Sequence, residues 1–129
     1  MNELNESLDL NIDFEKLSKI ALLNQGVLPC VVQHAKTLEV LNVAYVNEEA
    51  LKHSFKSGNA TFWSTSRNEI WEKGATSGEY LTLENVFINC EQNSLVYKVL
   101  PVKESTCHTG RNSCYYRKLD GESLTWLKE

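Results

Sequence analysis

LTLENVFINCEQNSLVYKVLPV, residues 81–102, is the stretch that decides the fold of this 129-residue chain. Residues 81–90 and 95–102 are rich in β-branched and aromatic side chains, and the polar residues 91–94 separate them. This pattern is typical of two strands joined by a turn. Pro101 marks an edge or a strand end, because proline has no N–H to donate to a neighbouring strand. We therefore expect a long β-hairpin here.

Shorter strands are predicted on both sides of this hairpin. Each is a run with β-branched or aromatic residues, bounded by turn-forming residues. Residues 105–113 show no periodicity and are predicted to form a loop. The additional predicted strands are 27–35, 40–46, 61–64, 70–72, 115–117 and 123–127, with turns at 36–39 and at Asp120-Gly121.

One good helix is predicted after residues 40–46. Asn47 is a suitable N-cap, and Glu48 and Glu49 in the first turn complement the helix dipole. Leu51 and Phe55 lie one turn apart. Gly58 can end the helix in a left-handed conformation. A strand-rich chain with one good helix indicates an α+β fold, mostly antiparallel β.

The chain is predicted to hold a single domain at 13–129, preceded by a flexible lead-in at 1–12. Asp13 is a candidate N-cap for a short helix in which Phe14, Leu17 and Ala21 share one face. We see no internal repeat, linker or low-complexity block.

Composition excludes several classes of function. A net charge of −4 without basic stripes argues against nucleic-acid and membrane surfaces. No apolar run is long enough to span a bilayer. The polar, acidic start, residues 1–10, lacks the features of a signal peptide, so we expect a cytoplasmic protein.

Four cysteines then need an explanation compatible with the cytosol, where thiols are buried, catalytic or metal-bound. Cys90, Cys107 and Cys114 could supply three zinc ligands and leave a fourth position open to water, as in catalytic zinc sites. Zinc lowers the pKa of bound water, which suits hydrolysis. Spacing alone leaves buried, unreactive thiols equally open. Cys30, within an apolar strand, is predicted to pack as a small hydrophobe.

Histidine and oxygen-bearing residues adjoin these cysteines. His108 directly follows Cys107 and is a candidate general acid or base, or else a surface-loop histidine. Asn89, Glu91 and Asn93 offer oxygen ligands beside Cys90, or else form a simple polar turn. No role is assigned to the remaining histidines, His34 and His53.

Residues 62–67 and 71–78 are dense in hydroxyls and contain two cations and two tryptophans. Hydroxyls, backbone N–H groups, Arg and Lys are the groups that hold phosphate, and tryptophan can stack on a base. The alternative is a polar loop with core tryptophans. The candidate substrate-binding residues are Ser64, Ser66, Arg67, Trp71, Lys73, Thr76 and Ser77.

Five blocks in this order make the chain resemble the phosphoribosyl-AMP cyclohydrolase family of histidine biosynthesis, over about residues 13–117. The last two blocks together are highly specific. The blocks are Val27-Leu28-Pro29 followed by Val31-Val32-Gln33, then AYVNEEAL (44–51), FWSTSR (62–67), WEKGATSG (71–78) and CHTGRNSC (107–114).

The resemblance implies a homodimer with its active sites at the subunit interface. It implies a zinc ion held by the cysteines at positions 90, 107 and 114, one of them donated by the partner subunit. It also implies hydrolytic opening of the adenine ring of N1-(5-phosphoribosyl)-AMP between N1 and C6. His108 is then placed to move a proton, and the hydroxyl-rich segments to bind the two phosphates.

The chain also departs from the family's pattern. Alternating aspartates, interpreted as a magnesium site, are usual where Asn89, Glu91 and Asn93 stand, so we expect much weaker magnesium binding. His34 replaces a usual aspartate, Leu38 a turn glycine, and position 112 carries asparagine where a basic residue is common. Three interpretations follow: a true cyclohydrolase with a different second-metal requirement, a diverged paralogue acting on another purine nucleotide, or a catalytically inactive protein.

Overall fold

The computed structural model describes residues 7–102 and 113–126. Cys107, His108 and the position-112 asparagine lie outside these residues. The elements, in chain order, are α2 (Lys16–Leu22), β1 (Leu28–His34), β2 (Val40–Val46), α3 (Glu48–Ser57), β3 (Thr61–Ser64), β4 (Glu69–Glu72), β5 (Leu81–Ile88), β6 (Leu95–Pro101), β7 (Arg117–Asp120) and β8 (Ser123–Trp126).

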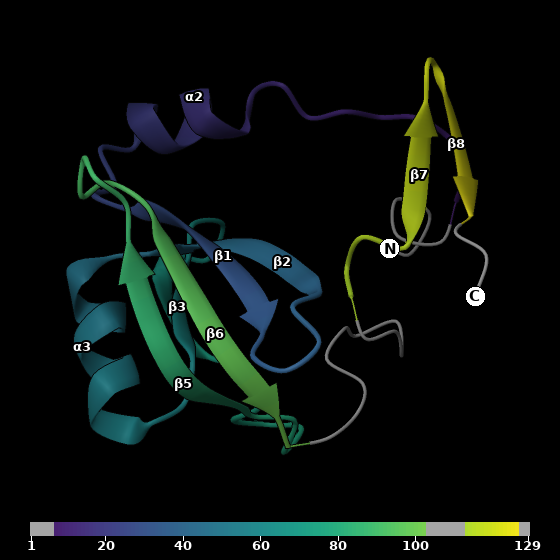
Figure 1. Cartoon of the computed structure of the whole chain (residues 1–129). Helices are drawn as coiled ribbons and strands as arrows, with labels where there is room; N and C mark the ends of the chain where they lie inside the picture. Colours follow the sequence, from purple (N-terminus) through teal and green to yellow (C-terminus); the bar gives the residue numbers. More distant parts are fainter. Residues whose placement is uncertain (1–6, 103–112, 127–129) are drawn as a thin grey trace.

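A four-stranded sheet in the order β2-β1-β6-β5 forms the body of the molecule (Figure 1). The β1–β2 and β5–β6 pairs are antiparallel hairpins, as the sequence predicts. The central pair, β1 with β6, is parallel, with Cys30 opposite Leu95. The predicted α+β class with mostly antiparallel strands is confirmed, and the described residues contain two helices.

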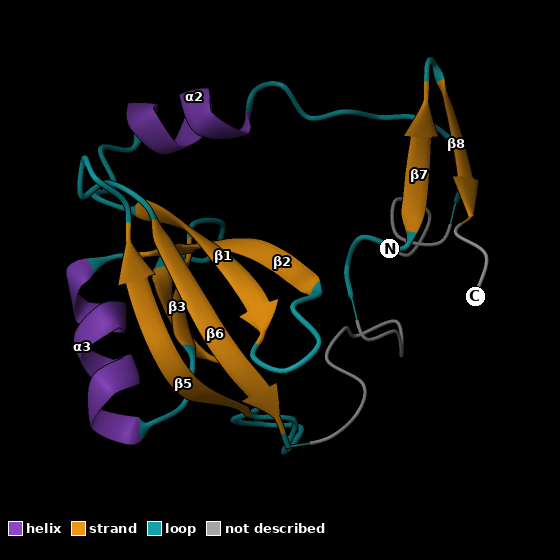
Figure 2. Ribbon diagram, viewed as in Figure 1, coloured by secondary structure: helices purple, strands orange, loops and turns teal. Residues whose placement is uncertain are grey.

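The core lies between this sheet, α3 and β3. α3 contacts β2, β3 and β4, and lies beside the sheet (Figure 2). Tyr97 and Val99 on β6 are completely buried, as are Cys30 on β1 and Ala50 on α3. Alternate residues of β6 therefore point into the core, as the period of two in a strand requires.

A buried hydroxyl joins the three layers of this core. The O–H of Tyr97 donates to Ser54 Oγ at 3.2 Å, and the backbone N–H of Thr61 donates to the same oxygen at 2.9 Å. Ser54 Oγ also lies 2.9 Å from the carbonyl oxygen of Ala50. A buried polar group costs little only when it is hydrogen-bonded, so this network fixes α3 against β3 and β6.

The capping residues of α3 are predicted correctly from the sequence, whereas the N-cap of α2 is not. Asn47 Oδ1 accepts from the N–H of Ala50, and Gly58 ends α3 with φ of 78°. Asp13 is not the N-cap of α2, since its carboxylate accepts from the N–H of Glu15, ahead of the helix. The predicted apolar face is also mostly exposed, with Phe14 at 83% and Leu17 at 66%.

The bounds of several strands differ from the predicted ones. β5 ends at Ile88, because the side chain of Asn89 closes the turn that follows, and Cys90 lies in that turn. β4 begins at Glu69, one residue before the predicted start. The predicted strand 115–117 lies instead at Arg117–Asp120.

The β7–β8 hairpin lies away from the four-stranded sheet (Figure 1). Leu119 is 51% exposed and Trp126 is 41% exposed, although Trp126 stacks on Tyr116. Within residues 7–102 and 113–126, no helix is long and apolar enough to cross a membrane.

Candidate functional site

The cysteines fall into two kinds of environment. Cys30 is completely buried, and burial raises the pKa of its thiol to about 12, so it stays protonated near neutrality. Cys90 and Cys114 are exposed. The prediction that Cys30 packs as a small hydrophobe is therefore confirmed, whereas Cys90 and Cys114 lie at the surface. Cys107, the third predicted ligand, lies outside the described residues.

Cys90 and Cys114 lie at opposite edges of the sheet. Cys90 follows the end of β5, whereas the backbone N–H of Cys114 donates to the carbonyl of Leu41 on β2, at 2.8 Å. Three strand spacings, about 14 Å in total, separate these outer strands. Zinc–sulfur bonds are about 2.3 Å long, so one zinc ion cannot bind both thiols of a single chain.

Residues 113–115 are fixed on the edge of β2. The buried hydroxyl of Ser113 donates to the carbonyl of Val40 at 2.8 Å and accepts from the N–H of Tyr115 at 3.0 Å. With the Cys114 bond to Leu41, these contacts hold the last cysteine in one place.

The turn between β3 and β4, residues 64–68, carries three predicted substrate-binding residues. Ser64 Oγ accepts from the N–H of Arg67 at 3.2 Å and lies 3.4 Å from Ser66 Oγ. Arg67 Nε also contacts Ser64 Oγ, at 3.4 Å. The terminal guanidinium nitrogens of Arg67 have no hydrogen-bond partner among the described residues and are available to an anion.

Gln25, which the sequence analysis missed, holds this turn from outside. Its Nε2 donates to the carbonyl of Thr65 and to Asn68 Oδ1, both at 3.2 Å. Its Oε1 is buried and has no partner within the described chain. A lone glutamine before a strand carries no sequence signal, because both contacts join residues about 40 positions away.

The remaining predicted substrate-binding residues lie at the other end of the β3–β4 hairpin. Ser64 pairs with Glu69 at one end and Thr61 with Glu72 at the other, so about 10 Å of strand lies between the 64–68 turn and the 73–78 loop. Thr76 and Ser77 are exposed in this loop. The structure therefore divides the predicted residues into two polar groups.

Gly74 sets the shape of the 73–78 loop. Its φ is +95°, and a Cβ there would lie 2.3 Å from the backbone nitrogen of Tyr80. Only glycine fits such a conformation and approach. Beside it, the ammonium of Lys73 lies 6.0 Å from the ring centre of Trp71, and Trp71 packs against Phe62. Trp71 remains 38% exposed.

His53, which received no role, joins α3 to β4. Its Nε2 lies 2.8 Å from Glu72 Oε1, and Asn59 donates to Glu72 Oε2 at 3.1 Å. The hydrogen bond from His53, with a smaller one from Asn59, holds the pKa of Glu72 below its usual range. This pair braces the hairpin end that carries Lys73.

His34 caps the β1–β2 turn. Its Nδ1 accepts from the N–H groups of Lys36 and Thr37, at 3.1 and 3.3 Å. Leu38 has φ of 65°, in the left-handed region that favours glycine.

The predicted metal residues beside Cys90 form a closed turn. Asn89 Nδ2 donates to Asn93 Oδ1 at 2.7 Å, and Glu91 is exposed. Among the described residues, no group of three His, Cys, Asp or Glu side chains could hold a metal ion.

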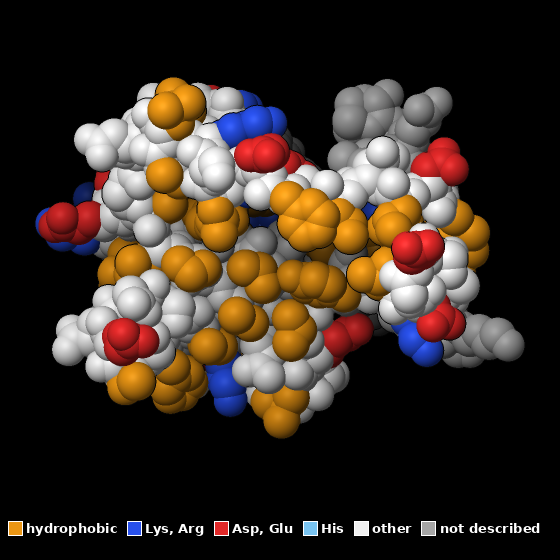
Figure 3. Space-filling view, turned by 90° about the horizontal axis from the view of Figure 1, so that it is seen from above, with side chains coloured by type: hydrophobic (Ala, Val, Ile, Leu, Met, Phe, Trp, Pro, Cys, Tyr) orange, Lys and Arg blue, Asp and Glu red, His pale blue; other side chains and the backbone are white. Residues whose placement is uncertain are grey.

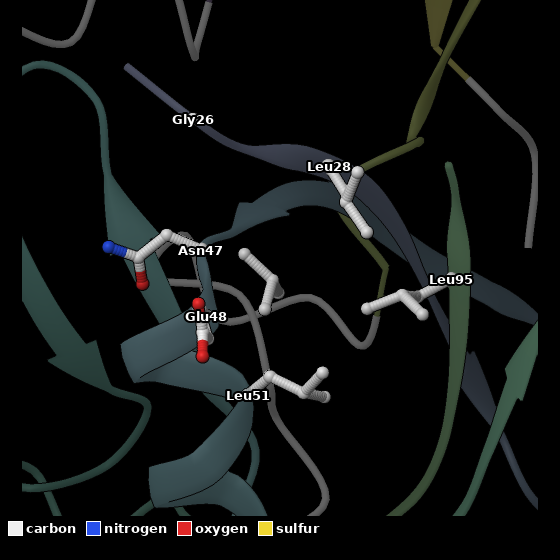
Figure 4. A pocket seen from close by; sticks show the side chains of 7 residues that line it. Gly26, Leu28, Asn47, Glu48, Leu51 and Leu95 are labelled. Atoms are coloured by element: carbon white, nitrogen blue, oxygen red, sulfur yellow. The ribbon is translucent and has the colours of Figure 1, made fainter. Parts of the chain in front are cut away.

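A hollow of about 240 Å³ opens at the same end of the sheet (Figure 4). The side chains of Leu28, Leu51 and Leu95 point into it, and Glu48 lies at its side. None of the predicted site residues lines it. An apolar lining beside a carboxylate does not suit a phosphate, so this hollow is not the phosphate-binding part of the site.

Comparisons with known proteins identify the class. The family model described as Phosphoribosyl-AMP cyclohydrolase matches residues 42–116. A Phosphoribosyl-AMP cyclohydrolase from Desulfatibacillum aliphaticivorans is 36% identical over 93% of this chain and 90% of its own length. One from Archaeoglobus fulgidus is 43% identical over 78% of this chain and 92% of its own. These relatives are hydrolases that act on cyclic amidines. The chain belongs to the phosphoribosyl-AMP cyclohydrolase family.

Longer relatives place the family in a pathway. The Histidine biosynthesis bifunctional protein HisIE of Aquifex aeolicus is 37% identical over 82% of this chain and 52% of its own length. The chain therefore matches about half of that bifunctional protein.

Proposed function

We propose that the chain catalyses the hydrolysis of N1-(5-phosphoribosyl)-AMP in histidine biosynthesis, as a zinc-dependent homodimer. Family membership supports the reaction. The observation that carries the zinc-dependent dimer is the exposure of Cys90 and Cys114 at opposite edges of one sheet.

The reaction adds one water molecule across the N1–C6 bond of the adenine ring. The water oxygen bonds to C6 and becomes the carboxamide oxygen, while N1 leaves with the electron pair of the broken bond and takes a proton. His108, beside a predicted zinc cysteine in the sequence, is our candidate to move that proton.

Cys90, Cys107 and Cys114 are the residues that would hold zinc. Three protein ligands with one open position are typical of catalytic zinc, and zinc at such a site lowers the pKa of water to near neutrality. The exposed thiols of Cys90 and Cys114 fit this donor set, and the buried Cys30 does not.

Three features support assembly with a second copy. The separation of Cys90 from Cys114 means that a shared zinc needs two chains. The β7–β8 hairpin is two-stranded and set apart, and such hairpins are marginally stable alone. Hydrophobic side chains also gather across the face shown in Figure 3. On α2, Leu17, Leu22 and Leu23 are 66%, 86% and 66% exposed. Exposed apolar surface of this kind is typical of an interface.

The two polar groups of the β3–β4 hairpin match a substrate with two phosphates. Arg67 with its serines forms one anion-binding end, and Lys73 with Thr76 and Ser77 forms the other. The separation of the two groups, about 10 Å of strand, lets each phosphate bind independently.

The first experiment measures turnover of N1-(5-phosphoribosyl)-AMP by ultraviolet absorbance with zinc-loaded protein. We expect turnover that Cys114→Ser abolishes, while Cys30→Ala, which keeps an apolar side chain in the core, retains it. A folded, zinc-loaded dimer without turnover would contradict the proposal and favour the diverged paralogue, for which the altered residues 89–93 argue.

Mixing inactive variants tests the shared site. Cys90→Ser and Cys114→Ser chains, co-expressed with different tags, form heterodimers in which one of two sites has all its cysteines. Random pairing then restores about a quarter of the wild-type activity. Purified heterodimers that stay inactive would exclude a zinc site shared between chains. A control that combines Cys90→Ser with itself under both tags stays inactive.

A further inference from the structure

The turn after β5 is closed by side-chain amides. Asn89 Oδ1 accepts from the backbone N–H groups of Asn93 and Ser94, at 2.8 and 2.9 Å. Asn89 Nδ2 donates to Asn93 Oδ1 at 2.7 Å. Gln92 adopts φ of 57°, and its N–H donates to the Asn89 carbonyl. Cys90 lies between the two asparagines.

The backbone fixes which amide atom faces which. A backbone N–H can only donate, so the Asn89 atom that receives two of them is the oxygen. Its nitrogen must then face Asn93, which presents its oxygen in turn. An N–H group of Asn89 therefore lies between the side chains of residues 89 and 93. If both residues were carboxylates, a cation would lie in that place.

The residues present do not fit a magnesium ion. Magnesium requires an octahedral set of hard oxygen ligands and is normally bound through carboxylates. Asn89 Oδ1 is used by the backbone and Asn93 Oδ1 by the Asn89 amide. Glu91 is the one carboxylate within residues 89–94.

We propose that the Asn89–Asn93 amide pair replaces magnesium in this chain, so that the Cys90 turn is closed without a second metal. Aspartates at these two positions would place oxygens 2.7 Å apart with no donor between them, and would need a cation. The pair thus makes the position of the Cys90 thiol independent of magnesium.

Thermal unfolding of the zinc-loaded protein, with and without millimolar magnesium chloride, tests this inference. Magnesium is omitted rather than chelated, because a chelator would also remove zinc. We expect no change in Tm for the wild type. The Asn89→Asp/Asn93→Asp variant is expected to unfold about 4 °C lower without magnesium and to recover most of that loss with it.

Gln92→Glu is the matched control, because it adds a carboxylate to the same turn without touching the pair. It should show no magnesium response. A wild-type Tm that rises with magnesium, or calorimetric binding of magnesium to the wild type, would overturn the inference. So would a folded double variant without a magnesium response. If the double variant does not fold, the wild-type measurements of Tm and of calorimetric magnesium binding decide.

This inference and the proposed function fail separately. Tm and magnesium binding do not depend on catalysis. A protein without turnover whose Tm does not change with magnesium would therefore contradict only the proposed function. An active protein whose turnover requires magnesium removes only the inference.

Discussion

Two polar turns near the same end of the molecule differ in how many of their side-chain hydrogen-bonding groups are without a partner. Both the 64–68 turn and the 89–94 turn contain a non-glycine residue with positive φ, Asn68 and Gln92. In the first, the terminal nitrogens of Arg67 lack partners among the described residues. In the second, Asn89 and Asn93 bond each other. A polar turn binds a ligand only with the hydrogen-bonding capacity that its own closure leaves unused.

Removing the guanidinium group of Arg67 from the 64–68 turn should have the largest effect on substrate binding. A charge-assisted hydrogen bond contributes about 1.5–3 kcal/mol, so Arg67→Ala should raise KM about 10- to 100-fold. Steady-state kinetics measure this change. Lys52→Ala removes an exposed cation on α3 and is the control. An unchanged KM for Arg67→Ala would show that this turn does not bind substrate.

Removing the hydrogen bonds that Gln25 donates to the same turn should have a smaller effect on substrate binding. Gln25→Glu keeps the shape of the side chain but loses the donor that holds Thr65 and Asn68. We expect KM to rise about 5-fold, since one hydrogen bond contributes about 1 kcal/mol, with kcat nearly unchanged. If kcat falls and KM stays constant, Gln25 does not act by positioning this turn.

The β1–β2 turn also contains a non-glycine residue with positive φ, and this residue is expected to lower the stability of the fold. Leu38 holds φ of 65° in the turn that His34 caps. A left-handed conformation costs a side chain about 1–2 kcal/mol, partly offset by the chain entropy that glycine adds on unfolding. Leu38→Gly should raise the free energy of unfolding by about 1 kcal/mol in a denaturant titration. Thr37→Gly, at a position without positive φ, should lower it.

The smallest predicted effect is on stability at acidic pH, from the His53–Glu72 pair at the end of the β3–β4 hairpin away from the 64–68 turn. The pKa of Glu72 is lowered from 4.5 by its His53 partner, so the pair adds stability above pH 4.5 that is lost as the pH falls through the lowered pKa. Both side chains are partly exposed, so this gain is about 1 kcal/mol at most. Acid unfolding followed by circular dichroism should be less steep for Glu72→Gln. Identical curves would assign the acid sensitivity to other groups.

Local signals in the sequence predict local structure well. Residues 40–46 and 61–64 form strands with the predicted bounds, because a turn or a helix end lies on each side of them. Asn47 and Gly58 cap α3 as predicted, since a cap depends on residues within one helical turn.

What the sequence could not provide is long-range placement. The parallel β1–β6 pair joins residues far apart in the chain, and no periodicity records which strands become neighbours. The separation of Cys90 from Cys114 follows from that strand order. The Gln25 contacts and the Asn89–Asn93 bond depend on side-chain orientation, which composition cannot give. Assignments for Cys107 and His108 stay predictions.

The parallel pairing of β1 with β6 also governs how the chain folds as it is made. The β1–β2 hairpin and the β3–β4 hairpin close short loops and can form early. Cys30 and Tyr97, however, meet only after residues 95–99 have been synthesised and insert beside β1. The nascent chain therefore exposes the apolar strand β1 until residues 95–99 have left the ribosome, and chain truncated before β6 should need chaperones to stay soluble.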